Sequence, residues 1–150
     1  MVAGSVMALF LSALFALNTS SMAMIRTARE SACASQVLQQ RIEAMRIANW
    51  HQATDADWLA ANLLNTDAPG ASLLHSVAET VSLIPYGSNN PGSTQITRSG
   101  GTVTVVSRNS ALLAEDAAKV IWTVNYTGAP NDKTYSRQVV AILGKGGVAK

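Results

Sequence analysis

Few residues of this chain have the types and the spacing that catalysis or metal binding requires. Its two histidines, His51 and His75, have no neighbours at metal-ligand spacing. His51 together with Asp55 and Asp57 is the one arrangement that could be imagined as a metal cluster. The run Thr54-Asp55-Ala56-Asp57 is also typical of a helix start, where carboxylates cap the first turn, and we interpret both acids in this way.

Other patterns associated with ligand binding are weak. The glycine-rich run at 144–147 lacks the strand–loop–helix context of a phosphate-binding loop, and no G-x-S-x-G is present. Asn131 and Asp132 could hold a loop calcium, but a turn requires the same residue types. The single cysteine, Cys33, lies in a helical pattern and is interpreted as a packed hydrophobe. The sequence therefore predicts no catalytic residue, no cofactor and no metal, and we expect a protein that is not an enzyme.

The N-terminal segment is the most informative one, because residues 1–25 contain no charged side chain. At about 1.5 Å per helical residue this segment spans about 37 Å, and the hydrocarbon core of a bilayer is about 30 Å thick. We therefore expect a membrane-spanning or filament-core helix. Its large apolar residues include Val2, Val6, Leu9, Phe10, Leu14, Phe15 and Leu17.

Two other interpretations of this segment remain open. Ser21-Met22-Ala23 is similar to the cleavage site of a secretory signal peptide, although no basic region precedes the apolar run. A helix that is apolar on all sides could also be buried in a soluble protein. The remainder of the chain, roughly 100 residues, is small for that purpose.

The helical pattern continues beyond the apolar segment and becomes amphipathic. Leu38, Ile42 and Met45 fall on one arc of the helix, and glutamines and charged residues fall on the opposite arc. Two residues depart from this pattern. Arg41 lies inside the apolar arc, where we expect a buried stem and a solvated guanidinium. Ile47 lies on the polar face, where it could contact a neighbouring subunit.

The rest of the sequence changes from a helical to an alternating pattern. A short helix is expected at 55–64, a loop at 65–71 and either a helical turn or a crossover at 109–119. Strands are expected at 76–84, 94–98, 102–108, 120–126 and 133–143. Because helix is followed by strands, the sequence predicts an α+β fold, in which one very long N-terminal helix packs by its second half on a small antiparallel β-meander.

These patterns divide the chain into an apolar helix at 1–25 and a globular domain at 26–150. Within the domain we expect an amphipathic helix, a connecting region, a sheet and a tail, at 26–52, 53–75, 76–143 and 144–150 respectively.

One face of the predicted sheet has to meet the apolar arc of the helix. Trp122 and Val124 alternate with more polar residues, so they share a face of their strand. We expect the second half of the helix to cover that face through Leu38, Ile42 and Met45.

The order of the elements and two segments resemble type IV pilin-like proteins. Residues 1–15, Met-Val-Ala-Gly-Ser-Val-Met-Ala-Leu-Phe-Leu-Ser-Ala-Leu-Phe, look like the interior of that family's N-terminal helix. Residues 34–46, Ala-Ser-Gln-Val-Leu-Gln-Gln-Arg-Ile-Glu-Ala-Met-Arg, look like its second half in minor pilins and type II secretion pseudopilins. The C-terminal hairpin at 122–143 is similar to theirs as well. The family's Gly-Phe-Thr-Leu-x-Glu motif and a C-terminal cysteine pair are absent from this sequence.

The resemblance implies a structural subunit of a type IV pilus-like or type II secretion pseudopilus filament. Such a subunit is anchored in the bacterial inner membrane and is then bundled through its N-terminal helix into an extracellular or periplasmic filament. The implied partners are pilin-like subunits, as a homo- or hetero-oligomer, together with the inner membrane and the assembly machinery. A scattered net charge of +2 indicates no nucleic-acid partner. The alternative is a single-pass membrane-tethered binding or enzymatic domain.

We predict that the genomic reading frame extends upstream of Met1 and encodes a basic leader, a glycine and a glutamate close to the apolar run. The reason is that the first residues look like the interior of a membrane-length helix without its basic flank. Sequencing the genomic region tests this expectation. A stop codon directly before Met1, with native protein beginning there, would exclude the prepilin interpretation.

Overall fold

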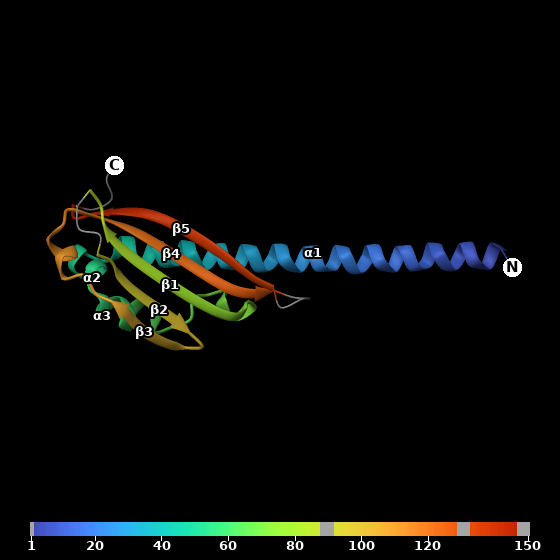
Figure 1. Cartoon of the computed structure of the whole chain (residues 1–150), viewed down its shortest axis with the longest axis horizontal. Coiled ribbons are helices and arrows are strands. Elements are labelled where there is room, and N and C mark those ends of the chain that lie inside the picture. The colour runs from blue at the N-terminus through green and yellow to red at the C-terminus, as the bar shows by residue number, and fades with distance from the viewer. Residues whose placement is uncertain (1, 88–91, 129–132, 147–150) are drawn as a thin grey trace.

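A single helix of 46 residues, α1 (Val2–Ile47), forms the N-terminal part of the protein. The computed structural model describes residues 2–87, 92–128 and 133–146, with the side chains from residue 6 onward. Figure 1 shows that α1 extends far beyond the rest of the molecule, which lies alongside its second half. At about 1.5 Å per residue the helix is about 69 Å long. No proline interrupts it, so its backbone hydrogen bonds continue from end to end.

Helix α1 ends at Ile47, earlier than the predicted boundary at residue 52. Asn49 is extended and begins a new helix, α2 (Trp50–Thr54). The Asn49 side chain accepts a hydrogen bond from the Gln52 N–H at 2.9 Å, and the Gln52 side chain accepts one from the Asn49 N–H at 3.2 Å. This reciprocal capping box stabilises a new helix start, which explains why α1 does not continue.

The connecting region is mostly helical. Asp55 is the N-cap of helix α3 (Ala56–Leu59), and its side chain accepts a hydrogen bond from the Asp57 N–H at 3.0 Å. The expected helix start is present, but it begins one residue later than predicted, so only Asp57 lies in the first turn. The chain continues as a π-helical turn at Ala60–Leu64, and a 3-10 turn at Ala71–Leu73 leads into the sheet. Most leucines of this region are buried, so it forms part of the core.

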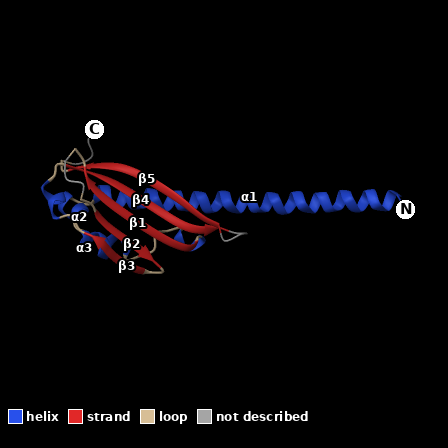
Figure 2. Ribbon diagram, in the orientation of Figure 1, coloured by secondary structure: helices blue, strands red, loops and turns tan. Residues whose placement is uncertain are grey.

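The second half of the chain forms a five-stranded antiparallel sheet with the order β3-β2-β1-β4-β5. Its strands are β1 (His75–Pro85), β2 (Thr94–Ser99), β3 (Thr102–Ser107), β4 (Ala117–Gly128) and β5 (Lys133–Gly144). Figure 2 shows them as one layer beside the second half of α1. The predicted meander is wrong, because β4 pairs with β1 and not with β3. The chain crosses between β3 and β4 through a 3-10 turn at Ser110–Ala114.

This strand order has a physical reason in the burial pattern. Inward residues of β1 and β4 are buried, whereas those of β3 are only half-buried. Pairing β4 with β1 therefore places the two most apolar strand faces together at the centre of the sheet. A simple meander would have placed β4 beside the more exposed β3.

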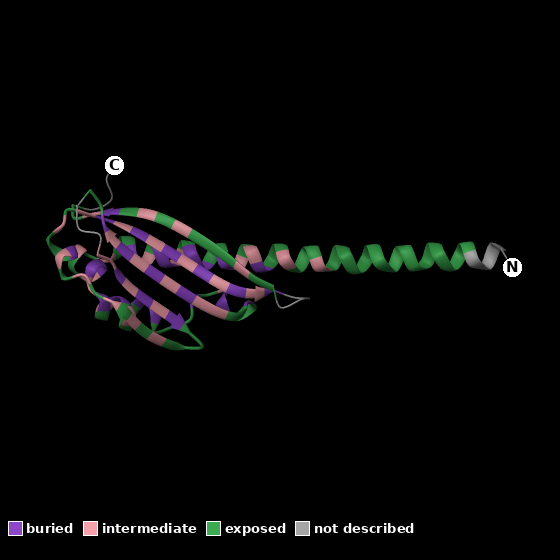
Figure 3. Cartoon of the chain, viewed as in Figure 1, coloured by how far each residue is buried: buried purple, intermediate pink, exposed green. Residues whose placement is uncertain are grey.

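The second half of α1 packs on one face of the sheet. Leu38, Ile42 and Met45 are at most 8% exposed, and Trp122 and Val124 are fully buried. All five belong to one hydrophobic cluster, and Figure 3 shows burial concentrated where helix and strands meet. The opposite face of the sheet has no helix over it in Figure 3, and its side chains are only partly buried.

Replacing Leu38 or Ile42 by Ala should lower the free energy of unfolding by about 2–5 kcal/mol, because each change leaves a cavity between helix and sheet. Ile47 is 87% exposed on the same helix, so Ile47→Ala should change that free energy by less than about 0.5 kcal/mol. Denaturation of the full-length protein in detergent, followed by tryptophan fluorescence, measures all three variants. Two core variants as stable as Ile47→Ala would show that the faces are wrongly assigned.

Candidate functional site

The first half of α1 is an apolar surface without a partner in its own chain. From Val6 to Ile25 the large apolar side chains are between 47% and 70% exposed. The helix is long and apolar enough to cross a membrane, and none of its most apolar stretch is buried. Six residues predicted for this surface lie on it: Val6, Leu9, Phe10, Leu14, Phe15 and Leu17. Val2 also lies in α1, but its side chain is outside the described part.

Two hydroxyls within this apolar surface, those of Ser12 and Thr19, are satisfied by the helix itself. The Ser12 hydroxyl donates to the Leu9 carbonyl at 2.8 Å, and the Thr19 hydroxyl donates to the Ala16 carbonyl at 2.9 Å. Because these hydroxyls do not require water, the segment suits an apolar environment. The first charged residue of the chain is Arg26.

Charged residues mark the point where α1 meets the sheet. Glu30 is only 5% exposed and forms an ion pair with Arg26, one helical turn earlier, at 3.4 Å. Arg137 of β5 donates to the Ser31 hydroxyl at 2.5 Å. Gly128 leaves room for Glu30, because a Cβ at residue 128 would lie 2.7 Å from the Glu30 Oε2 atom. The exposed apolar surface therefore ends where the globular domain begins.

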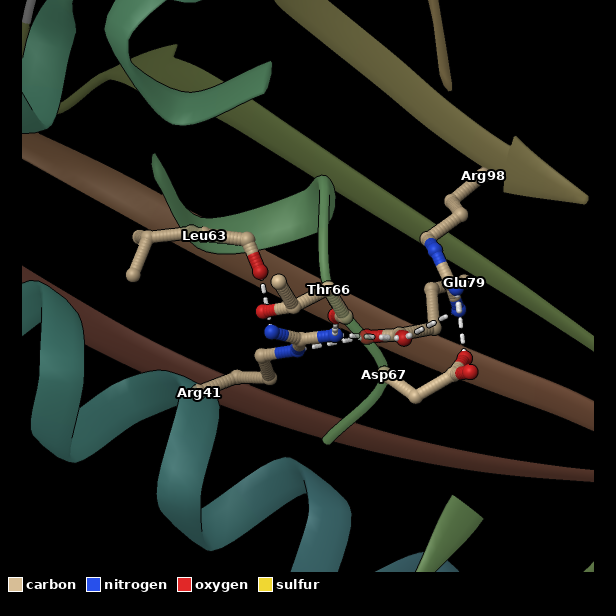
Figure 4. A network of polar contacts seen from close by, with 6 residues as sticks. All are labelled: Arg41, Leu63, Thr66, Asp67, Glu79 and Arg98. Atoms are coloured by element: carbon tan, nitrogen blue, oxygen red, sulfur yellow. Dashed lines mark hydrogen bonds and ion pairs between the residues drawn. The ribbon is translucent and has the colours of Figure 1, made fainter. Parts of the chain in front are cut away.

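A second polar cluster lies inside the helix–sheet core (Figure 4). Arg41 of α1 binds Glu79 of β1 through two hydrogen bonds of 2.8 Å, from Nε to Oε2 and from Nη2 to Oε1. Arg41 also donates to the carbonyl oxygens of Leu63, through Nη1, and of Thr66, through Nη2 at 2.8 Å. Glu79 is fully buried and Arg41 is 6% exposed. These hydrogen bonds replace the hydration that both charges lose on folding.

Arg98 of β2 brings a second positive charge to the same cluster. Its Nη2 lies 2.5 Å from Asp67 Oδ1, and its Nη1 lies 3.6 Å from Glu79 Oε1. Glu79 and Arg98 are opposite each other in the β1–β2 register, so strand pairing itself brings them together. The Arg98 side chain is 7% exposed, whereas that of Asp67 is 72% exposed.

The burial of Arg41 corrects the expectation that its guanidinium would reach solvent. It turns inward because a buried carboxylate, Glu79, faces it from the sheet. Glu79 and Arg98 were missed by sequence reasoning, although a signal was present. Glu79 is in phase with buried Val81 along β1, and Arg98 is in phase with buried Ile96 along β2. A charge at an inward strand position requires a partner in the core.

The two acidic residues considered for metal binding together with His51 have other roles. Asp57 forms an exposed bidentate ion pair with Arg108, at 2.6 and 2.8 Å, and Asp55 caps α3. Among the described residues, no group of three His, Cys, Asp or Glu side chains is placed to hold a metal ion. Asn131 and Asp132, considered for a loop calcium, lie outside the described part.

The hydrogen bonds from Arg108 lower the pKa of Asp57 below its ordinary value of 3.8. Because the folded value is the lower one, the pair stabilises the fold above about pH 4, and this contribution is lost as the pH falls through the folded pKa. Both side chains are exposed, so solvent screens the interaction and keeps it weak.

Arg41→Ala should lower the free energy of unfolding by about 3–5 kcal/mol, because Glu79 would remain buried without its main partner. Arg46 on the same helix forms an exposed ion pair with Glu43 at 3.0 Å, so Arg46→Ala should cost less than about 1 kcal/mol. Urea denaturation of the full-length variants in detergent gives both values. Equal losses for the two arginines would mean that the buried pair does not stabilise the core.

No protein-family model, curated protein or solved structure matches this chain. Its function is therefore indicated by its own surface and core chemistry, namely an unpartnered apolar helix joined rigidly to a domain that contains a buried ion-pair cluster.

Proposed function

We propose that this protein is a structural subunit of a type IV pilus-like or type II secretion pseudopilus filament. The observation that carries the proposal is the first half of α1, which is apolar, exposed and continuous with a half that packs on its own domain. In water such a surface requires a partner. Before assembly the partner is the inner membrane, where α1 is a single-pass anchor. After assembly the partners are the corresponding helices of other pilin-like subunits.

Transfer of the helix from membrane to filament has a small energetic cost. Both environments are apolar, and the Ser12 and Thr19 hydroxyls are satisfied within the helix in either one. Relative to water, burial in a helix bundle stabilises by about 25 cal/mol per Å² of apolar surface. Relative to lipid this advantage is absent, so the quality of helix–helix packing decides whether subunits associate.

One side of the helix is suited to close contact with another helix. At about 100° per residue, five small residues fall within an arc of about 80°. They are Ala8, Ser12, Ala16, Thr19 and Ala23. Small side chains let two helix backbones approach closely, which is how helices associate in an apolar solvent. A helix that only tethers a domain does not require such a side, so this distribution favours an assembling subunit over a tethered binding or enzymatic domain.

The proposed role is physical and not catalytic. The assembly machinery extracts each subunit from the membrane, and the exposed helices bundle into the filament core. Repetition of one head-to-tail contact that does not close on itself generates a helical filament. The globular domain then lies outside the bundle, at the position that the helix–sheet packing fixes.

Deleting residues 1–25 should give a soluble monomer that keeps its sheet and forms no filament. The deleted residues lie outside the hydrophobic core, so the domain retains its own packing, whereas the surface needed for bundling is lost. Size-exclusion chromatography, circular dichroism and electron microscopy of the full-length and deleted proteins test both parts. Filaments from the deleted protein, or its complete unfolding, would contradict the proposal.

A point variant with a matched control tests whether filament formation depends on the exposed apolar surface of α1. Leu14→Arg places a charge in the exposed apolar surface and should abolish filament formation. Gln39→Arg places the same charge at an exposed position of the same helix, beside the domain, and should leave filaments intact. Unmodified full-length protein that remains monomeric in membranes even when the assembly machinery is present would indicate a tethered domain instead.

A further inference from the structure

Arg98 carries a buried positive charge that its own chain pairs incompletely. Arg41 uses both Nε and Nη2 to bind the two oxygens of Glu79. Arg98 uses Nη2 for a single oxygen of Asp67, and its Nε has no hydrogen-bond partner although the atom is buried. Glu79 is already occupied by Arg41 and lies 3.6 Å from Arg98. The Nε–Nη2 edge of a guanidinium is the edge that donates two hydrogen bonds to one carboxylate. In Arg98 only the Nη2 atom of this edge has a partner.

A cavity of about 460 Å³ adjoins this arginine. Arg98 and Asp67 line it, together with Ser72, Ser76 and Ser99. The Asp67 side chain is 72% exposed, so Asp67 remains solvated when another carboxylate takes its place on Arg98. An incoming carboxylate would then bind the Nε and Nη2 of Arg98 together, as Glu79 binds Arg41, and the serine hydroxyls could donate further hydrogen bonds to it.

The backbone around this cavity departs from regular strand geometry. Ser76 has a φ of 49°, and no other non-glycine residue in the described part has a positive φ. It lies where the β1–β4 register shifts, between His75 and Ala78. Gly100 and Gly101, which also have positive φ, form the β2–β3 turn on the other side of the cavity. Serine in this conformation is strained, which is a property that concentrates at binding sites.

The same chain carries an acidic pair without a partner. Of its nine acidic residues, Asp132 lies outside the described part. Six others pair with a cation or cap a helix: Glu30, Glu43, Asp55, Asp57, Asp67 and Glu79. Within the described residues, Glu115 and Asp116 form no side-chain hydrogen bond or ion pair. The Asp116 carbonyl accepts a hydrogen bond from the Lys145 N–H at 2.8 Å, which holds this segment against the end of β5.

The Arg98 pocket and the acidic pair lie at opposite ends of the sheet. Strands β1 and β4 are antiparallel, so the end where β1 begins is the end where β4 finishes. The pocket includes Ser76 and Val77 at the start of β1, whereas Glu115 and Asp116 directly precede β4. In Figure 1 the β2–β3 turn points toward the free half of α1, and the segment before β4 lies at the far end of the domain.

We propose that the Arg98 pocket binds a carboxylate of Glu115 or Asp116 from a second copy of this chain. The proposal rests on the filament function and adds the contact that joins successive domains. Copies whose α1 helices run parallel in a bundle present these two ends to each other. The contact is head to tail, so each subunit offers one pocket and one acidic pair, and the series continues along the filament. The occupant of the pocket is the carboxylate, and Asp67 is the group it displaces.

Disulfide crosslinking of the full-length protein tests this contact, in a Cys33→Ala background and in cells that contain the assembly machinery, so that assembled subunits are present. Ser99, which lines the pocket, and Asp116, which belongs to the acidic pair, are both exposed and are each replaced by Cys. Oxidation of the double variant should give a ladder of multimers, because every copy carries both ends. The matched control replaces Asp116→Cys by Glu43→Cys, an exposed acidic position on α1, and should give no ladder.

Two further measurements test whether the pocket recognises a carboxylate and whether Glu115 supplies it. Adding Glu115→Gln to the double variant removes the last acid of the pair and should lower the multimer yield at least tenfold. Acetate should lower the yield by competition, whereas chloride at the same ionic strength should not. A multimer yield that is unchanged by both Glu115→Gln and acetate would overturn carboxylate recognition.

A helix crosslink distinguishes failure of this contact from failure of the filament proposal. Ala16→Cys lies on the small-residue side of α1 and should give dimers when helices bundle. Ala16→Cys dimers without a Ser99–Asp116 ladder would overturn the pocket contact and leave the filament proposal standing. Absence of both crosslinks would overturn the filament proposal together with the contact that depends on it.

Discussion

The packing of the second half of α1 on the sheet is the interaction on which the rest of the structure depends. Because α1 is one unbroken helix, fixing one half on the sheet also fixes the direction in which the other half leaves the domain (Figure 1). Met45 and Trp122, both at most 1% exposed, form part of this contact. A proline or glycine between the halves would have allowed the apolar half to fold back on its own domain. The uninterrupted helix keeps that surface available to a partner.

The Arg41–Glu79 pair gives this packing a defined register, which apolar contacts do not provide. Buried ion pairs are often no more stabilising than apolar residues of similar volume, so stability alone does not explain the pair. Leucine and isoleucine side chains tolerate small shifts of a helix along a sheet, because hydrophobic attraction is not directional. Two hydrogen bonds of 2.8 Å to one carboxylate do not tolerate such shifts. A slide of one turn, about 5.4 Å, would leave two buried charges unpaired, so the pair fixes the register of α1 on the sheet.

Much of the fold could be predicted because helical and alternating patterns reflect which side chains face the core. The long helix, the strands and the burial of residues such as Leu38 and Val124 follow from those periods. The strand order could not be predicted, because local patterns do not specify which strands pair. The pairing of β4 with β1 depends on how the whole sheet packs. The end of α1 was missed because Asn49 is a capping residue inside an otherwise helical pattern.

The polar core shows a different limit of sequence reasoning. Arg41 alone is compatible with a solvated head group, and only the juxtaposition of α1 and β1 reveals its partner. Glu79 and Arg98 were recognisable as charges in phase with buried residues, yet their pairing depends on the β1–β2 register. Apolar periodicity therefore predicts that a residue is buried, whereas the identity of a buried partner requires the three-dimensional arrangement.

An assembly built on apolar helices alone would lack a defined axial position. Helix surfaces such as Leu9 and Phe15 gain similar energy over a range of displacements, because burial of apolar area is not directional. Charged and polar contacts between domains contribute specificity and register more than affinity. Glu79 links the two requirements within one subunit, since it binds Arg41 of the helix at 2.8 Å and lies 3.6 Å from Arg98. The same buried carboxylate therefore contacts both the arginine that holds the helix and the arginine that lines the pocket at the domain surface.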